Sequence, residues 1–213
     1  MTRLDTPVSE GAVTVRPSDV AFTDSVKAIQ TRKGSRKAYA RMEEGGGWST
    51  TIPDDLAAFI AEQNSFFLAT ANAAGQPYIQ HRGGPPGFLH VLDETTLAFA
   101  DFRGNRQYIS LGNLAENPKV HLFLIDFAQR RRVKIWGEAK VVEDDPALVA
   151  RLTPPGYDAR PERAFVIHVA AWDENCPQHI PQRLEAADVA QALAARDRRI
   201  AELEATIARL EER

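Results

Sequence analysis

Hydrophobic residues change their spacing twice along this chain. Before residue 63 they recur every three or four positions, as in Phe22, Val26 and Ile29, which predicts short helices. After Pro181 the helical spacing returns, in a segment that contains no glycine and no further proline. Between these parts the runs are strand-like, and the predicted strands cover 65–71, 76–82, 87–92, 96–101, 119–126, 131–143 and 163–172.

Residues that favour turns and helix ends mark the boundaries of these elements. Thr23 or Asp24 caps the first predicted helix, and Gly34 ends it. A turn at 72–75 joins the first two strands as a hairpin, and residues 93–95 join the next two. Several short strands with short turns and few helices predict a closed β-barrel.

Two helices are expected to interrupt the strands. One covers about 105–115, and the other covers about 146–152 with Asp144 and Asp145 as its cap. The sequence therefore predicts three regions: an N-terminal extension with short helices at 1–50, a barrel domain at 51–180, and a C-terminal amphipathic helix at 181–213.

The tail carries a regular apolar stripe with one polar member, Arg196. Charges of both signs fill its other faces. This pattern fits either a coiled coil with the same helix of a second copy or a helix packed along its own barrel. The apolar members are Ala186, Val189, Leu193, Ile200, Leu203, Ile207 and Leu210.

Composition narrows the class of protein. With 213 residues, 44% hydrophobic, 26% charged and a net charge of −3, the chain is neither disordered nor a polybasic nucleic-acid binder. It has no apolar run near the roughly 20 residues that span a bilayer, and residues 1–19 lack the apolar core of a secretory signal. The single cysteine, Cys176, excludes an intrachain disulfide and a thiolate zinc cage. A cytoplasmic protein that binds neither nucleic acid nor membrane is expected.

Two predicted strand ends place an arginine beside a glycine. Arg82 precedes Gly83, and Gly104 precedes Asn105 and Arg106 where a strand runs into a helix. Glycine lets the backbone approach a ligand closely, and a helix N-terminus beside guanidinium groups suits an anion. A plain surface loop explains the first of these segments equally well when it is taken alone.

A run of three arginines opens the strand at 131–143. Alternation puts Arg130 and Arg132 on one face and Arg131 on the other. The run is either a solvated strand edge or a contact with a bound ring or another subunit.

The irregular segment at 172–182 gathers an aromatic ring, a thiol, an imidazole and amides. Such a loop suits a cap over a cofactor. Cys176 and His179 lack a third orienting residue, so the sequence does not favour a nucleophilic pair. The other histidines fall on separate strands, so no metal site is predicted.

With these segments in order, residues of about 55 to 180 resemble the pyridoxamine 5′-phosphate oxidase-like, FMN-binding split-barrel family. The resemblance implies a six-stranded antiparallel split β-barrel that forms a homodimer, with FMN bound between the subunits. The matching segments are Phe66-Phe67-Leu68-Ala69-Thr70, Gly75-Gln76-Pro77-Tyr78, Leu97-Ala98-Phe99-Ala100-Asp101, Gly104-Asn105-Arg106, Asn117-Pro118 and Arg132-Val133-Lys134-Ile135-Trp136-Gly137.

The resemblance also implies which residues bind the cofactor. Arg106 is retained in the family's phosphate segment, where Gln107 replaces a lysine, and Arg132 stands where a glutamine approaches the flavin ring. Gln178 and His179 are expected near the ring, from the second subunit. The implied cofactor-binding residues are Gln80, His81, Arg82, Gly83, Ala100, Asp101, Asn105, Arg106, Gln107, Arg132, Gln178 and His179.

The chain departs from true pyridoxamine-phosphate oxidases at its end. It lacks their Arg-x-His substrate element and closing Arg-Leu-x-Pro, so oxidation of pyridoxamine phosphate is not expected. The resemblance implies an oxidoreductase that exchanges hydride between FMN and NADPH, NADH or a small organic acceptor, with no catalytic residue assigned. The alternatives are a non-catalytic protein that binds or senses FMN or heme, an F420-dependent reductase, and a scaffold organised by the C-terminal helix.

Overall fold

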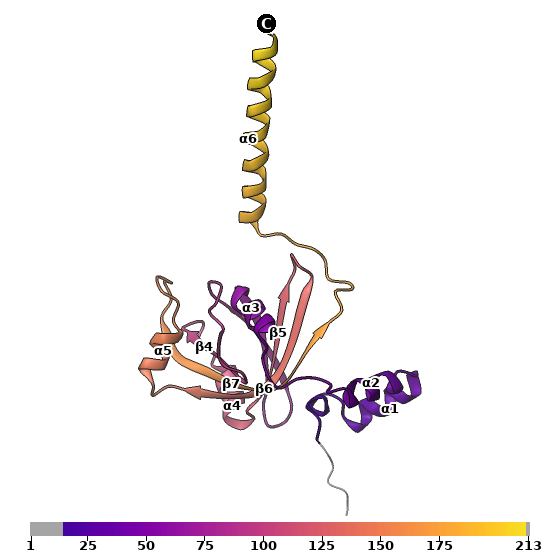
Figure 1. Ribbon diagram of the computed structural model, residues 1–213. Coiled ribbons are helices and arrows are strands. Elements are labelled where there is room, and N and C mark those ends of the chain that lie inside the picture. Colours follow the sequence, from indigo (N-terminus) through magenta and orange to yellow (C-terminus); the bar gives the residue numbers. More distant parts are fainter. Residues whose placement is uncertain (1–14, 212–213) are drawn as a thin grey trace, which may run out of the picture.

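The computed structural model describes residues 15–211, drawn in Figure 1 with the labels used below. Residues 1–14 of the predicted extension and 212–213 of the predicted tail lie outside the described residues. The helices are η1 (Pro17–Val20, a 3₁₀ helix), α1 (Asp24–Lys33), α2 (Arg36–Glu44), α3 (Asp54–Glu62), α4 (Ile109–Glu116), α5 (Pro146–Leu152) and α6 (Ala186–Glu211). The strands are β1 (Ser65–Ala71), β2 (Pro77–Gly83), β3 (His90–Asp93), β4 (Thr96–Phe102), β5 (Lys119–Asp126), β6 (Arg131–Val142) and β7 (Pro161–Asn175).

The strands of the described residues form one antiparallel sheet in the order β2-β1-β5-β6-β7-β4-β3. The predicted mainly β, antiparallel architecture is confirmed. The predictions of six strands and of a closed barrel are wrong, because the sheet has seven strands and its edge strands, β2 and β3, do not pair. Closure depends on the tilt and register of strands far apart in sequence, which a local alternating pattern does not specify.

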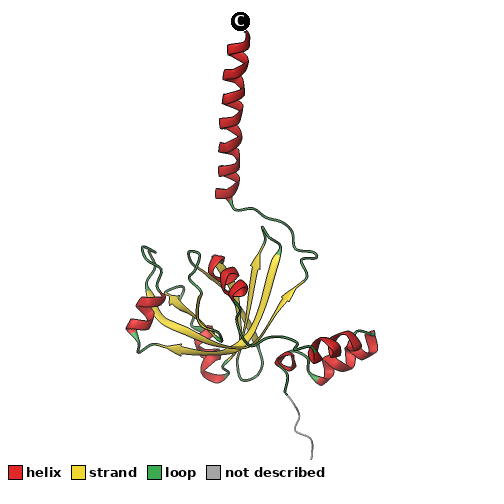
Figure 2. Ribbon diagram, in the orientation of Figure 1, coloured by secondary structure: helices red, strands yellow, loops and turns green. Residues whose placement is uncertain are grey.

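The sheet bends where its two longest strands, β6 and β7, change register. The shift falls between Trp136 and Gly137. A Cβ atom on Gly137 would lie 2.4 Å from the carbonyl oxygen of His168, so only glycine allows this close approach. In Figure 2 the strands converge at the base of the sheet and fan out to both sides.

The core fills the concave side of the sheet. The apolar face of α3, made by Leu56, Phe59 and Ile60, is buried there as its spacing predicts. Alternation along β1 sends Phe66 and Leu68 to the same side. Each such large apolar side chain contributes about 1.5–3 kcal/mol when fully buried. The core therefore holds the bent sheet and α3 together.

Most predicted element ends are confirmed. Thr23 Oγ1 accepts a hydrogen bond from the Val26 N–H, and Gly34 ends α1 with a φ of 82°. Asp145 caps α5, where its Oδ1 accepts from the Leu148 N–H at 2.8 Å. The hairpin at 72–75 also forms, with Ala71 opposite Pro77.

Three predicted ends are wrong. The last strand, expected to end at residue 172, continues to Asn175, because its end stays paired with β6. The strand expected from residue 87 begins at His90, because a turn precedes it in which the Phe88 N–H donates to the Pro85 carbonyl oxygen. The helix expected from residue 105 begins at Ile109, because Arg106 and Tyr108 adopt positive φ angles of 61° and 54°. A helix cannot propagate through such residues.

Aromatic side chains join the N-terminal helices to the outward face of the sheet. Trp48 stacks on Trp136 of β6 with 4.6 Å between ring centroids, and Phe22 packs against Trp48. Trp172 of β7 donates its indole N–H to the carbonyl oxygen of Thr51 at 2.7 Å. We refer to Trp48, Trp136 and Trp172 as the tryptophan joint.

The C-terminal helix α6 projects away from the sheet (Figure 1). None of its residues from Ala186 to Glu211 is buried. The alternative in which the tail packs along its own barrel is therefore wrong for this structure. Across residues 15–211, no helix combines the length and the apolar character needed to cross a membrane.

Candidate functional site

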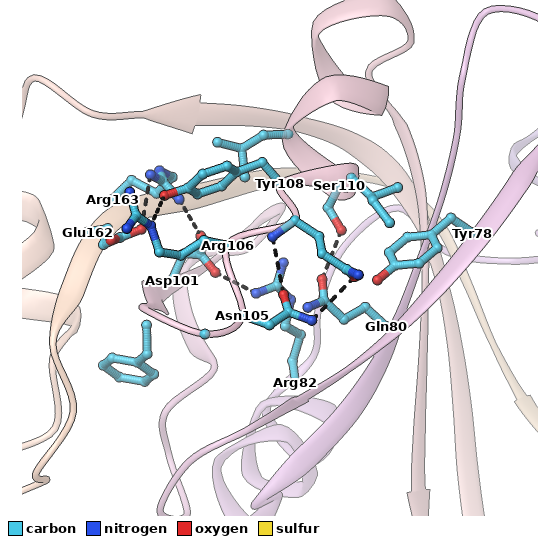
Figure 3. A pocket seen from close by; sticks show the side chains of 15 residues that line it. Tyr78, Gln80, Arg82, Asp101, Asn105, Arg106, Tyr108, Ser110, Glu162 and Arg163 are labelled. Carbon is cyan, nitrogen blue, oxygen red and sulfur yellow. Dashed lines mark hydrogen bonds and ion pairs between the residues drawn. The ribbon is translucent and has the colours of Figure 1, made fainter.

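A polar pocket lies where β2, the end of β4, the start of β7 and the N-terminal end of α4 meet (Figure 3). It combines guanidinium, carboxylate, amide and hydroxyl groups from segments far apart in the sequence. Its lining residues are Tyr78, Gln80, Arg82, Asp101, Phe102, 104–111, Glu162 and Arg163.

Asp101 joins two arginines at the base of the pocket. One carboxylate oxygen pairs with Arg82 of β2, and the other lies 2.9 Å from Nη1 of Arg163 on β7. Asp101 and Arg163 are buried, and Arg82 is mostly buried. Because β2 and β4 are not neighbours in the sheet, the Arg82–Asp101 ion pair links its two sides through side chains, where backbone pairing is absent.

Arg163 and Arg82 differ in how many of their N–H groups have an acceptor within the protein. Arg163 also pairs with Glu143 at 2.8 Å and Glu162 at 3.2 Å. Burial lowers the pKa of Arg163, but hydrogen bonds to Asp101 and Glu143 outweigh it and raise the pKa above its ordinary value. By contrast, Nε of Arg82 is buried and has no hydrogen-bond partner among the described residues. A buried donor of this kind normally has an acceptor, so Arg82 can serve a bound ligand.

The loop between β4 and α4 carries Arg106 to the rim of the pocket. Nε of Arg106 donates to the Tyr108 hydroxyl at 3.1 Å, and this hydrogen bond raises the pKa of Arg106. The ring centroid of Tyr108 in turn lies 5.4 Å from the guanidinium carbon of Arg163. Asn105 Oδ1 accepts from the Gln107 N–H at 3.2 Å. These contacts hold the positive-φ loop in one shape.

The first turn of α4 forms another wall of the pocket. Its N-cap residue, Tyr108, makes no side-chain capping hydrogen bond to the first N–H groups of the helix, and residues 109–111 line the pocket. Ser110 donates to Gln80 Oε1 at 3.0 Å, which ties α4 to β2. An anion in the pocket would meet these N–H groups together with guanidinium donors.

A second cavity continues from the first on the other side of Arg82. The two share Gln80, Arg82, Phe102 and Gly104. Their volumes are about 50 and 180 Å³, below the roughly 300–1,000 Å³ of a typical cofactor pocket. The single chain thus encloses room for a small anionic group and leaves any larger ring partly uncovered.

The structure brings nine of the twelve predicted cofactor residues to these two cavities. Gln80, Arg82, Asp101, Asn105, Arg106 and Gln107 line the first, and the second adds His81, Gly83 and Ala100. Their contacts with a cofactor stay predictions.

The other three predicted residues lie elsewhere on the chain. Arg132 is at the start of β6, paired with Ile125, and its Nε is buried without a partner among the described residues. Gln178 and His179 are exposed after β7. Neither cavity includes these residues, so their predicted roles require a second subunit.

The sequence analysis missed Arg163, Tyr108 and Ser110. One signal for Arg163 was available: it shares the alternating face of Phe165 and Ile167, and a charge on a buried strand face needs a partner. Tyr108 and Ser110 gave no signal, because the helix was expected to start before them. Among residues 15–211, no group of three or more His, Cys, Asp or Glu is placed to hold a metal ion.

The fold and the pocket define an antiparallel β protein whose buried arginines and helix N-terminus suit an anionic ligand. The family model described as pyridoxamine 5′-phosphate oxidase matches residues 52–176, more than half of the chain. The chain belongs to the pyridoxamine 5′-phosphate oxidase family. No curated protein matches the sequence.

Solved structures with a similar arrangement are known from several bacteria. HupZ of Group A Streptococcus is 18% identical, with a TM-score of 0.48, over 62% of this chain and 99% of its own. An FMN-binding protein of Syntrophomonas wolfei is 12% identical, with a TM-score of 0.44, over 68% and 97%. The heme storage protein HutZ of Vibrio cholerae is 16% identical, with a TM-score of 0.38, over 56% and 90%.

Proposed function

We propose that this protein is an FMN-binding flavoprotein that exchanges hydride with a nicotinamide cofactor or a small organic acceptor. The observation that carries the proposal is that Arg82 and Arg106 line one pocket beside the uncapped start of α4. The chain belongs to a family whose description names an oxidase of pyridoxamine 5′-phosphate, and this agrees with a phosphate-binding site.

The phosphate of FMN fits the smaller cavity by charge and by size. Arg106 supplies a guanidinium at the rim, the first turn of α4 supplies N–H groups, and Arg82 supplies a buried donor without a protein partner. Charge-assisted hydrogen bonds of this kind are the strong ones in phosphate recognition. Asp101 partly neutralises Arg82, so Arg106 and α4 carry most of the attraction.

The isoalloxazine ring would extend beyond the phosphate site and be covered by a second copy of the chain. The two cavities beside Arg82 are too small to enclose the ring. The outward face of β1 and β2, opposite the face that carries Gln80 and Arg82, is partly apolar, with Ile79 63% and Phe67 37% exposed. Such exposed apolar side chains favour burial in a homodimer, which would bring Arg132, Gln178 or His179 of one copy toward the flavin of the other.

FMN supplies two-electron hydride chemistry, and the chain would orient and tune it. Arg132 would donate a hydrogen bond to the polar edge of the ring, and its charge would favour an anionic reduced flavin. The absence of a GxGxxG segment from the sequence makes NADPH or NADH a transient co-substrate.

The absorbance spectrum of the purified protein tests the cofactor. Flavin is expected, with bands near roughly 370 and 450 nm that bleach when NADPH or NADH is added. A sharp Soret band would identify heme. Bands that persist with both nicotinamides would leave a flavin-binding protein without this reductase activity. Hydride transfer with reduced F420 and none with FMN would replace FMN by the deazaflavin.

A matched pair of arginine variants tests the phosphate site. Arg106→Ala removes an exposed side chain at the rim, so the fold is expected to persist while FMN binding weakens several-fold. Arg32→Ala removes an exposed arginine of α1, far from the pocket in sequence and structure, and is expected to bind FMN as the wild type does. Titration of flavin fluorescence measures both, and equal affinities would place the phosphate elsewhere.

A further inference from the structure

We infer that α6 pairs with α6 of a second copy of this chain, as a parallel and in-register two-stranded coiled coil. This interaction surface is separate from the outward sheet face that the proposed function assigns to the barrel dimer.

The helix α6 lacks packing within its own chain. The helix has 26 residues, which makes it about 39 Å long at 1.5 Å per residue. No residue between Ala186 and Glu211 is buried. Helices in proteins owe most of their stability to the packing of an apolar face, so a helix that projects alone needs a partner. The apolar face is therefore the surface to explain.

The spacing and the types of the apolar residues of α6 are typical of a two-stranded coiled coil. The exposed apolar side chains alternate at intervals of three and four, which assigns them to heptad positions a and d. In the last two heptads, isoleucine occupies each a position and leucine each d position, the combination that favours parallel dimers. The a positions are Ala186, Leu193, Ile200 and Ile207, and the d positions are Val189, Arg196, Leu203 and Leu210.

The charged side chains beside the apolar stripe favour one relative direction of the two helices. The e positions are acidic at Asp197, Glu204 and Glu211, and the g position before Glu204 is Arg199. In a parallel pair, g of one helix lies beside the next e of the other, so Arg199 meets Glu204 on both sides of the dimer. In an antiparallel pair, acidic e positions would face one another. The pattern thus favours a second copy in parallel over other partners.

Arg196 interrupts the apolar stripe at one d position. A polar residue in a coiled-coil core costs stability and restricts the registers in which two helices can pair. Its long aliphatic stem can still cover the core while its charge reaches solvent. The interruption therefore supports one fixed register.

Disulfide trapping in the full-length protein tests the pairing. In a Cys176→Ser background, Ile207→Cys places thiols at facing a positions, within the Cα separation of roughly 4.4–6.8 Å that a disulfide requires. Ala205→Cys, at an outward f position of the same helix, is the matched control. With glutathione disulfide as oxidant, the first variant is expected to form covalent dimers roughly 100-fold faster than the second, because paired helices raise the effective thiol concentration.

Equal trapping rates at positions 205 and 207 would overturn the proposal, because they would show two helices that are merely tethered near each other. Failure of both variants to form dimers would overturn it as well. Neither readout depends on bound flavin, so the result is independent of the proposed function.

Charge exchange between Arg199 and Glu204 tests the orientation. Two Ile207→Cys proteins, one carrying Arg199→Glu and the other Glu204→Arg, each place like charges opposite in their own dimers. When the two are co-expressed and oxidised, opposite charges meet only in the mixed dimer, so mixed dimers should exceed the half expected from random pairing. Mixed dimers at or below one half would rule out the parallel register.

Discussion

At the scale of single residues, Asp101 holds the guanidinium groups of Arg82 and Arg163 from two sides. Arg82 is also placed against aromatic rings, with its guanidinium 5.2 Å from the centroid of Phe165. An arginine fixed in this way loses little freedom when it binds a ligand, which favours affinity. Asp101 and the aromatic rings therefore hold Arg82 in place before a ligand binds.

Replacing Asp101 tests this organisation. Asp101→Asn keeps the size of the side chain but leaves Arg82 without a carboxylate, while Arg163 keeps Glu143 and Glu162. Breaking a buried ion pair costs about 3–5 kcal/mol in the free energy of unfolding. Asp145→Asn is the matched control, because asparagine caps a helix as well as aspartate does. Urea denaturation measures both. A small loss in Asp101→Asn would mean that solvent or other groups replace the carboxylate.

His121 gives the stability a predictable dependence on pH. Burial lowers its pKa below the ordinary value of 6.5, and the charge of Lys134 lowers it further. The unfolded chain therefore binds a proton at a higher pH than the folded chain does. The resulting loss of stability is absent well above pH 6.5 and grows as the pH falls from there through the lowered pKa.

A histidine variant isolates this contribution. Denaturation curves of the wild type and His121→Gln, measured between about pH 8 and pH 5, should differ by a constant above neutrality and diverge below pH 6.5 in favour of the variant. His168→Gln changes an exposed histidine and should follow the wild-type curve. A difference between wild type and His121→Gln that stays constant with pH would contradict the burial argument.

At the scale of elements, the bend of β6 against β7 depends on Gly137. Gly137→Ala places a methyl group against the His168 carbonyl and is expected to cost about 1–3 kcal/mol in the free energy of unfolding. Gly112→Ala in α4 meets open space and is expected to stabilise by about 0.5–1 kcal/mol, since alanine favours helices. The melting temperature should therefore fall in Gly137→Ala and rise in Gly112→Ala. Equal shifts would mean that the register change tolerates a Cβ atom.

Elements whose ends are set by neighbouring residues could be predicted from the sequence. The cap at Thr23, the hairpin at 72–75 and α5 after Asp145 are of this kind. The start of α4 could not be predicted, because Arg106 and Tyr108 adopt positive φ angles and the Tyr108 ring packs against Arg163, which is distant in sequence.

The candidate site also combines features set by neighbouring residues with features set by residues distant in sequence. Residues 80–83 and 104–107 stand out by their arginines and glycines, but their convergence depends on the ion pair of Arg82 with Asp101 across an open sheet. Arg163 is 62 residues from Asp101 in sequence, and no local pattern joins them. The types of residue in the site could therefore be predicted from the sequence, but the ion pairs between distant residues could not.

At the scale of the whole molecule, the body and α6 are expected to behave as separable parts. A chain that ends at Pro181 loses no buried residue of α6, so it should retain FMN with unchanged absorbance and affinity. Sedimentation of this shortened chain, compared with the full chain, measures how far α6 strengthens the dimer. Loss of flavin from the shortened chain would show that the tail contributes to the cofactor site.

All three tryptophans of the sequence belong to the tryptophan joint. Intrinsic fluorescence excited near 295 nm would therefore report on the attachment of residues 15–51 to β6 and β7, and through Trp172 also on the edge of the core. An emission shift during heating or ligand addition would signal release of that attachment. Far-ultraviolet circular dichroism is the appropriate probe for the sheet itself.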